Sequence, residues 1–236
     1  MSAPRILVIT AHPDDVDFGA GGSVAAWTSA GSEVSYCIVT DGDAGGFDEA
    51  VPREQIPGIR RAEQTAAAAA LGVSDLVFLG YPDGRLEVTM DLRRDLARVI
   101  RQVRPDRVVC QSPQRNYERI FASHPDHMAA GEAALCAVYP DARNPWAFPE
   151  LMAEGLGRHV VSEVWMMGGP DPDVWVDVTA TFDKKLTALR AHVSQETDRN
   201  GGLEERMRGW LGVQARQGGL PEGALAEGFR RIDTSE

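Results

Sequence analysis

Strand-like and helix-like segments alternate along the first 140 residues, and this alternation constrains the fold more than any other feature of the sequence. Continuous apolar runs rich in branched side chains are typical of parallel strands that are buried on both faces. Such runs lie at Arg5–Thr10, Glu33–Thr40, Asp75–Gly80 and Asp106–Gln111. The alternation therefore predicts an α/β fold, with a mostly parallel sheet that is flanked by helices on both faces.

The segments between these runs carry the signals of helices. Ile59–Leu71 is rich in alanine and is followed by Gly72, which favours the end of a helix. Apolar residues recur at helical spacing in Met90–Val103, ahead of Pro105. Helices are also expected at Gly22–Ala30, Asp126–Val138, Phe182–Val193 and Leu203–Gln217, and strands at Val160–Met167 and Val174–Val178. Pro140–Pro149 is expected to be a loop, and no element is predicted in the tail, which is rich in glycine and charge.

Composition narrows the classes of function. The 236 residues are 43% hydrophobic and 25% charged, and no repeat or linker interrupts them, so one domain is expected over residues 1–236. The chain has 24 Lys and Arg against 35 Asp and Glu, and the net charge of −11 disfavours nucleic acid as a partner. No segment resembles a signal peptide or approaches the ~20 apolar residues of a membrane span. A cytoplasmic chain with three free cysteines is expected.

Two short motifs rich in histidine and aspartate follow the first and the fourth predicted strand. They are Ala11–Asp15 (AHPDD) and Ser123–His127 (SHPDH). In a doubly wound sheet of order 3-2-1-4-5, these two strands are neighbours, and ligands bind at their carboxyl ends, where the direction of winding reverses. The strand order therefore predicts that the two motifs lie close together.

Metal-dependent hydrolysis is the chemistry that these residue types favour. A catalytic zinc ion takes three protein ligands and leaves a fourth position for water, and His12, Asp15 and His127 would supply such a set. Asp14 would then be free to act as a general base toward the zinc-bound water. His124 is placed to stabilise an oxyanion or to protonate a leaving amine. The same ligands also accept Fe²⁺, Co²⁺, Ni²⁺ or Mn²⁺.

Other interpretations of these segments were weighed. HPDD also favours a turn followed by a helix cap. The glycines of Gly19–Gly22 have the spacing GxGG rather than GxGxxG, and Asp14 and Asp15 would repel a pyrophosphate, so no nucleotide cofactor is expected. His192, on an amphipathic segment, is expected to be a packed histidine rather than a ligand.

The two motifs, with Phe18–Gly22 (FGAGG) after the first, resemble those of the LmbE-like (PIG-L) deacetylase family. Arg60–Glu63 (RRAE), Phe78–Gly84 (FLGYPDG) and Leu189–Gln195 (LRAHVSQ) are also similar to segments of that family, so the likeness spans most of residues 5–195. The resemblance implies a Rossmann-like sheet and a zinc-dependent enzyme that removes N-acetyl groups from molecules containing N-acetylglucosamine. It also suggests a homo-oligomer.

The resemblance assigns the same roles to the motif residues as the chemistry does: zinc ligands, general base, and acid or oxyanion stabiliser. It adds Asp126 as the residue that orients His124, and Arg60 and Asp83 as contacts of the sugar. One departure concerns a tyrosine that some members carry shortly before HPDH. Here Phe121 is close to that motif and the nearest tyrosine is Tyr117, which leaves open whether a loop residue assists the oxyanion.

Three functional hypotheses follow from these residues. The first is a hydrolase in which zinc-bound water attacks an N-acyl group, expected to be N-acetyl, on a small amino sugar or glycoconjugate and releases an amine. The second is an amidase with the same metal chemistry and a different amide conjugate as substrate. The third is a non-catalytic protein that binds a sugar or another metabolite.

Overall fold

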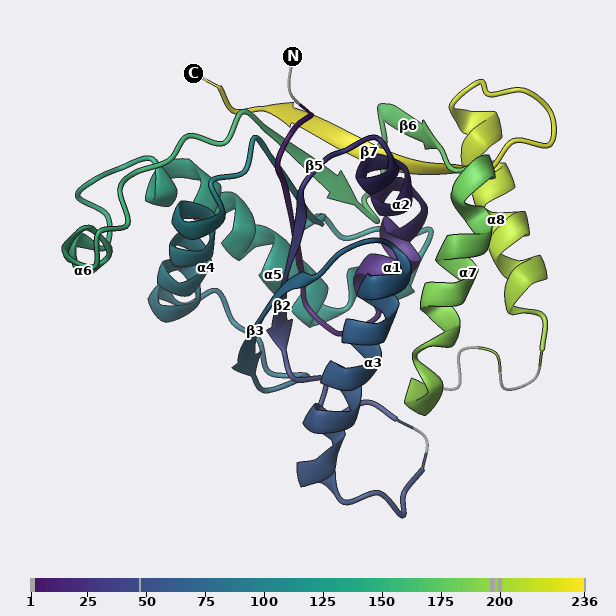
Figure 1. The fold of residues 1–236 in the computed structure, drawn as a ribbon, viewed down its shortest axis with the longest axis horizontal. Helices are drawn as coiled ribbons and strands as arrows, with labels where there is room; N and C mark the ends of the chain where they lie inside the picture. The colour runs from purple at the N-terminus through teal and green to yellow at the C-terminus, as the bar shows by residue number, and fades with distance from the viewer. Residues whose placement is uncertain (1–2, 47, 196–197, 199–200, 236) are drawn as a thin grey trace.

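The central sheet has the predicted order over its first five strands, and helices lie on both sides of it (Figure 1). The computed structural model describes residues 3–46, 48–195, 198 and 201–235, and within them the sheet has the order β3-β2-β1-β4-β5-β7-β6. The strands are β1 (Ile6–Thr10), β2 (Val34–Thr40), β3 (Asp75–Tyr81), β4 (Arg107–Gln111), β5 (Glu163–Met167), β6 (Val174–Asp177) and β7 (Ala226–Asp233). β1 pairs in parallel with both β2 and β4, so the winding reverses between β1 and β4.

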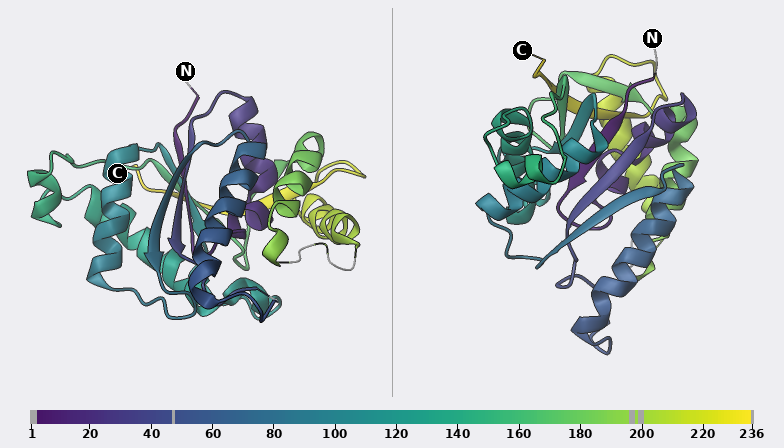
Figure 2. Two further views of the ribbon diagram at one scale, coloured as in Figure 1. Left: turned by 60° about the horizontal axis from the view of Figure 1, so that its bottom comes forward. Right: turned by 60° about the vertical axis from the view of Figure 1, so that its left-hand side comes forward.

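Helices cover both faces of the sheet, because successive residues of a strand point to opposite sides (Figure 2). One apolar layer joins Leu7 and Ile9 of β1 to α4 (Met90–Val103) and α5 (Pro125–Cys136). The other joins Ile6 and Val8 to α1 (Asp15–Gly19), α2 (Gly21–Ser29), α3 (Ile56–Ala70) and α7 (Phe182–Arg190). α8 (Leu203–Gln217) packs on α7 through a third apolar cluster. No helix within the described part of the chain is long and apolar enough to span a lipid bilayer.

The chain between α5 and β5 differs from its prediction. α5 is followed by a π-helical turn, η3 (Ala137–Ala142), and a short helix, α6 (Pro149–Ala153), begins where a loop was expected to end. The Arg101 guanidinium, which is buried, donates to the carbonyl oxygens of Asp141, Asn144 and Ala147. Because these contacts come from α4, local sequence signals could not predict them. The remaining turns are η1 (Arg53–Gln55), η2 (Ile120–Ser123), η4 (Thr179–Thr181) and η5 (Val193–Gln195).

The sequence analysis missed β7 entirely. This strand lies antiparallel between β5 and β6, where the charged tail was given no element. Its residue Glu227 is completely buried, and so is Lys185. The Glu227 carboxylate lies 2.7 Å from the Lys185 ammonium, which compensates its charge in the core. Because a charged residue occupies a core position, the hydropathy pattern of this segment does not indicate a buried strand.

The buried Lys185–Glu227 pair ties the C-terminal part of the chain to the segment that follows the first motif. Lys185 Nζ donates to the carbonyl oxygens of Asp17 and Phe18, both at 2.7 Å. The Glu227 carboxylate accepts from the first two N–H groups that follow Gly21, those of Gly22 and Ser23, at 3.0 and 2.8 Å. A carboxylate at the start of a helix satisfies donors that have no partner within the helix. The pair therefore fixes the junction of α1 and α2.

Candidate metal centre

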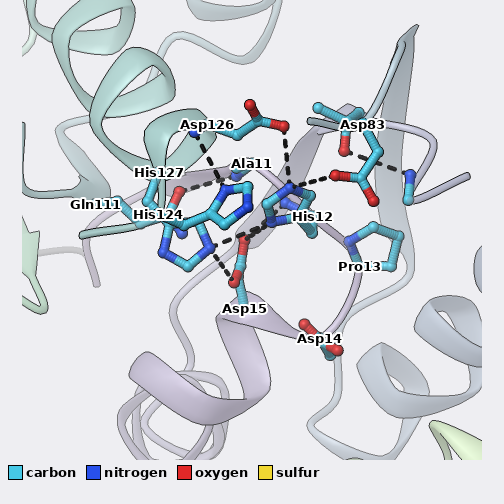
Figure 3. A network of polar contacts seen from close by, with 12 residues as sticks. Ala11, His12, Pro13, Asp14, Asp15, Asp83, Gln111, His124, Asp126 and His127 are labelled. Atoms are coloured by element: carbon cyan, nitrogen blue, oxygen red, sulfur yellow. Dashed lines mark hydrogen bonds and ion pairs between the residues drawn. The ribbon is translucent and has the colours of Figure 1, made fainter. Parts of the chain in front are cut away.

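The two histidine motifs meet at one edge of the sheet, as the strand order predicts (Figure 3). β1 and β4 run in parallel with Ile9 opposite Cys110, so the segments that follow them emerge side by side. The first motif forms the turn between β1 and α1, and the second leads from η2 into α5. His12 Nδ1 and His127 Nε2 lie 3.2 Å apart, although 115 positions separate them in the sequence.

Donor atoms of His12, His127 and Asp15 form a compact triangle, in which Asp15 directs Oδ1 toward His127 and Oδ2 toward His12. His127 Nε2 is 3.0 Å from Asp15 Oδ1, and His12 Nδ1 is 3.4 Å from Asp15 Oδ2 and 3.2 Å from His127 Nε2. Ligands about 2.0–2.1 Å from a tetrahedral zinc ion are separated from one another by about 3.3 Å. The donor types and their separations therefore fit a tetrahedral divalent ion with one position left for another ligand.

The other nitrogen of each imidazole is held by an acceptor. His12 Nε2 lies 3.0 Å from Asp83 Oδ1 and 3.2 Å from Asp126 Oδ2. His127 Nδ1 lies 3.4 Å from the carbonyl oxygen of Ala122. An acceptor at one nitrogen places the ring proton there and leaves the second nitrogen unprotonated for a metal. Both rings are thus oriented as metal ligands require.

Asp126 contacts two histidines, His12 through its carboxylate and His124 through its backbone N–H. Its carboxylate accepts from the backbone N–H groups of Gly84 and Leu86, at 2.7 and 3.2 Å, and contacts His12. Only the backbone N–H of Asp126 reaches His124, as a donor to Nδ1 at 3.2 Å. The Asp126 carboxylate thus lies against His12, and the expected role of Asp126 in orienting His124 stays a prediction, which its backbone N–H could serve.

The charges of the centre attract a cation. Burial disfavours a charged His12, but hydrogen bonds to Asp126, Asp15 and Asp83 outweigh it and raise the pKa of His12 well above its usual value. Burial also opposes ionisation of Asp15, yet the neighbouring His127 and His12 hold the pKa of Asp15 well below its usual range. The surrounding carboxylates thus favour positive charge at His12, and a divalent ion at Nδ1 would supply that charge in place of the second ring proton.

His124 stands at the start of α5 with one nitrogen available. Its Nδ1 accepts from the Asp126 N–H and so acts as the helix cap. A neutral imidazole that accepts at Nδ1 carries its proton at Nε2 and donates from there. Burial, together with the nearby His12 and His127, lowers the pKa of His124 and favours this neutral form. Ligand atoms of the three histidines lie within 4.8 Å of one another, as do those of His12, Asp83 and Asp126.

Asp14 lies between two candidate ligands but is not tied to the imidazoles. Figure 3 shows its carboxylate apart from the three rings, with no dashed contact to them. Burial raises the pKa of the Asp14 carboxyl to about 7, the charge of Asp15 adds to this effect, and Arg60 opposes it. A carboxylate with a pKa near neutrality is suited to general-base catalysis.

Arg60 and Asp83, the two expected sugar contacts, are both engaged at the centre. Arg60 is 2% exposed, and its guanidinium donates to the carbonyl oxygen of Pro13 and to Asp14 Oδ2, the latter at 3.2 Å. Asp83 contacts His12 Nε2 at 3.0 Å, as described above. Tyr117 is 83% exposed and Phe121 is 90% exposed. Contact of any of these four with a sugar stays a prediction.

Two glutamines that the sequence analysis did not single out hold the first motif. Gln111 Oε1 accepts from the N–H of Ala11 at 2.9 Å, and Gln64 Oε1 accepts from the N–H of Asp14 at 2.7 Å. Both side chains are buried. A signal was available for Gln64, since it follows Arg60 by four positions and therefore shares its helix face.

A cavity of about 580 Å³ lies beside the loop that carries Asp43, and its lining residues do not include those of the candidate metal centre. Acidic and apolar side chains line it, among them Asp43, Glu49, Ile56 and Val193. The loop that carries Asp43 is bonded to Asp83, because the N–H of Asp83 donates to Asp43 Oδ1 at 2.9 Å. A cavity of this size holds a ligand as large as a sugar.

The chain is similar in sequence and in fold to known deacetylases. The sequence profile of a family described as GlcNAc-PI de-N-acetylase (PIG-L) matches residues 7–138. A diacetylchitobiose deacetylase of Thermococcus kodakarensis is 33% identical over 191 residues, which cover 81% of this chain and 70% of that protein. A probable N-acetyl-alpha-D-glucosaminyl L-malate deacetylase 2 of Bacillus cereus is 35% identical, and the match covers 81% and 83% of the two chains. The solved structure of N,N'-diacetylchitobiose deacetylase from Pyrococcus horikoshii has a TM-score of 0.89 at 31% identity, covering 98% of this chain and 85% of that one.

Proposed function

The chain belongs to the GlcNAc-PI de-N-acetylase (PIG-L) family, and we propose from this premise that it is a metal-dependent hydrolase. Its reaction removes an N-acyl group, expected to be N-acetyl, from a small molecule that contains an amino sugar. The observation that carries the proposal is the triangle of His12 Nδ1, His127 Nε2 and the Asp15 carboxylate, with edges of 3.0–3.4 Å.

Zinc is the ion that we assign to this donor set, since two imidazoles and one carboxylate with an open position are typical of catalytic zinc. When bound, such an ion supplies Lewis acidity, which polarises an amide carbonyl and makes water a stronger acid. His12, Asp15 and His127 would hold it. Asp126 and Asp83 would keep His12 in the orientation and tautomer that binding requires.

The remaining side chains divide the proton transfers of amide hydrolysis. Asp14 accepts a proton from the attacking water as the oxygen–carbon bond forms. His124 donates from Nε2 to the oxygen on which negative charge develops. The proton taken up by Asp14 passes to the nitrogen as the carbon–nitrogen bond breaks, and the products are a free amine and a carboxylic acid, which ionises to a carboxylate.

Amino sugars are the substrate class that the relatives support. Two relatives are named as a diacetylchitobiose deacetylase and a probable N-acetyl-alpha-D-glucosaminyl L-malate deacetylase, so acetylated glucosamine is common to both names. The cavity beside Asp83 would take the group that is attached to the sugar. An amidase that acts on another conjugate is the second candidate, and it would share the metal centre and differ in this cavity.

Amine release from a substrate panel tests the proposal. Wild-type protein is expected to release amine from N,N'-diacetylchitobiose or N-acetylglucosaminyl malate, to lose this activity on chelation and to regain it with Zn²⁺. Asp14→Asn should keep the metal and lower kcat by about 10²–10⁴-fold. Asp41→Asn removes a carboxylate that pairs with Arg61 and is the matched control. Full turnover by Asp14→Asn, or turnover that survives complete removal of metal, would contradict the proposal.

A further inference from the structure

Asp14 occupies a backbone conformation that an L-residue adopts only when its surroundings hold it there. Its φ is 91° and its ψ is −26°, in the left-handed region. A β-carbon is strained in that region, so non-glycine residues are uncommon there. The direction in which the Asp14 carboxylate points therefore depends on the contacts that fix this backbone.

Helix α3 holds residue 14 at two points. Gln64 accepts the backbone N–H of Asp14, while Arg60 donates to the preceding carbonyl oxygen and to the Asp14 carboxylate. The two side chains lie four positions apart on one face of the helix, and both are buried. The Asp14 carbonyl oxygen accepts from the N–H groups of Asp17 and Phe18, at 2.9 and 3.1 Å, as α1 begins.

The Gln64 amide has one favourable orientation. Its Nε2 donates to Asp17 Oδ2 at 3.0 Å, and the same oxygen lies 2.8 Å from His192 Nε2. Gln64, Asp17 and His192 are all completely buried. A flipped amide would place its NH₂ group against the Asp14 N–H and its oxygen against a carboxylate, with no water to separate them. Asp17 and His192 thus keep the acceptor of Gln64 directed at Asp14.

We propose that Gln64 is a positioning residue for Asp14, with its amide oriented by Asp17 and His192. This inference rests on the proposed function, in which Asp14 is the general base. Gln64 contacts the backbone of Asp14 and carries no charge, so its effect on the reaction is geometric. Arg60 differs, because its guanidinium also contacts the Asp14 carboxylate and lies within its electric field.

The first test substitutes Gln64 by an apolar residue of similar length, Gln64→Met. Because a misplaced catalytic group slows the chemical step more than it weakens binding, kcat should fall about tenfold or more, with KM changed by less than about twofold. The bound metal should be unchanged. Adding Gln64→Met to Asp14→Asn should lower kcat by less than about twofold further, since residues that act as a unit are not additive.

Thr28→Val is the matched control. Thr28 Oγ1 donates to the carbonyl oxygen of Leu71 at 2.7 Å. Leu71 is the C-cap of α3 and follows Gln64 by seven residues. This variant loses a hydrogen bond to the same helix and should keep kcat. If Gln64→Met does not fold, Gln64→Asn replaces it, because the amide is retained and the reach is shortened by one methylene group. A kcat equal to that of Thr28→Val, or a loss that adds in full to that of Asp14→Asn, would overturn the inference.

Amide hydrogen exchange separates this inference from the proposed function, since it needs no substrate. The Asp14 amide should exchange faster in Gln64→Met than in wild-type protein, with exchange in Thr28→Val unchanged at this position. Unchanged exchange at Asp14 in Gln64→Met would overturn the inference, even if the protein proves to be a deacetylase. Faster exchange at Asp14 in Gln64→Met would support the Gln64–Asp14 contact even if the protein released no amine from any substrate, and that lack of activity would count against the proposed function.

Discussion

His12 has different partners at its two ring nitrogens, so one nitrogen can face a metal while contacts at the other hold the ring in place. Nδ1 faces His127 and Asp15, while Nε2 lies within 3.2 Å of carboxylate oxygens of Asp83 and Asp126. Acceptors at Nε2 set the tautomer and the tilt of the ring before any ion binds. In the proposed site, the carboxylates behind His12 would therefore set how tightly a metal binds.

Replacing Asp126 tests this role. Asp126→Asn removes the charge behind His12 and leaves every proposed ligand in place, so metal affinity should fall about 10- to 100-fold. Competition with a chelator of known affinity measures it. Asp141→Asn is the control, because Asp141 is similarly buried and pairs with Arg93 away from the centre. If Asp126→Asn binds metal as tightly as the control and loses only kcat, Asp126 acts through His124 instead.

The convergence of the two motifs could be predicted from the sequence, and the contacts behind them could not. The spacing of His12 and Asp15 and the strand order were enough to bring them to His127. The partner of Asp126 depends on where the loop at Gly84 lies, because two N–H groups of that loop hold the carboxylate. Gln64 was not predicted, because a neutral amide does not by itself indicate a catalytic role; only its spacing of four from Arg60 placed it on the same helix face.

At the scale of elements, the buried Lys185–Glu227 pair joins α7 and β7 to the start of α2. Each charge satisfies several backbone groups that would otherwise lie in the apolar layer without partners. A buried ion pair is costly to break because the remaining charge loses its compensation. This arrangement also explains why β7 could not be recognised: its sequence is charged where the structure is buried.

Removing one partner should therefore destabilise the protein strongly. Lys185→Met should lower the free energy of unfolding by about 3–5 kcal/mol. The double variant Lys185→Met with Glu227→Gln should recover part of that loss, because neither side chain then bears an unpaired charge. Urea unfolding of the wild type, both single variants and the double variant measures the coupling. A loss below about 1 kcal/mol for Lys185→Met would contradict the role given to the pair.

The junction of β4, β5 and β7 should give stability that depends on pH. Burial opposes ionisation of Glu163, but its contacts with Arg107 and Arg231, both at 2.7 Å, outweigh burial and lower the pKa of Glu163. A carboxyl with a lower pKa in the folded state stabilises it above the unfolded pKa of about 4.3, and this contribution disappears as the pH falls through the folded value.

Glu163→Gln should consequently be less stable than the wild type at pH 7, and the difference should shrink below about pH 4. Chemical unfolding at a series of pH values measures the difference. Glu205→Gln, at an exposed position of α8, is the control and should follow the wild type at every pH. A gap between Glu163→Gln and the wild type that stays constant from pH 7 to pH 3 would contradict the assignment.

At the scale of the whole molecule, the order of the strands in the sheet determines which chain segments meet at the candidate site. Strands β1 and β4 are neighbours although about 100 residues separate them, and the winding reverses between them. Ligands bind at such a reversal because the loops there diverge and leave room. The alternation of strands and helices made this arrangement predictable, whereas the antiparallel pair β6 and β7 depended on tertiary contacts that no local pattern carries.

Anomalous diffraction from zinc-loaded crystals tests whether the two motifs form one metal centre. We expect one peak at the zinc absorption edge, about 2 Å from His12 Nδ1, His127 Nε2 and one oxygen of Asp15. A peak bonded instead to Asp83 and Asp126, or no peak between the two motifs, would contradict it.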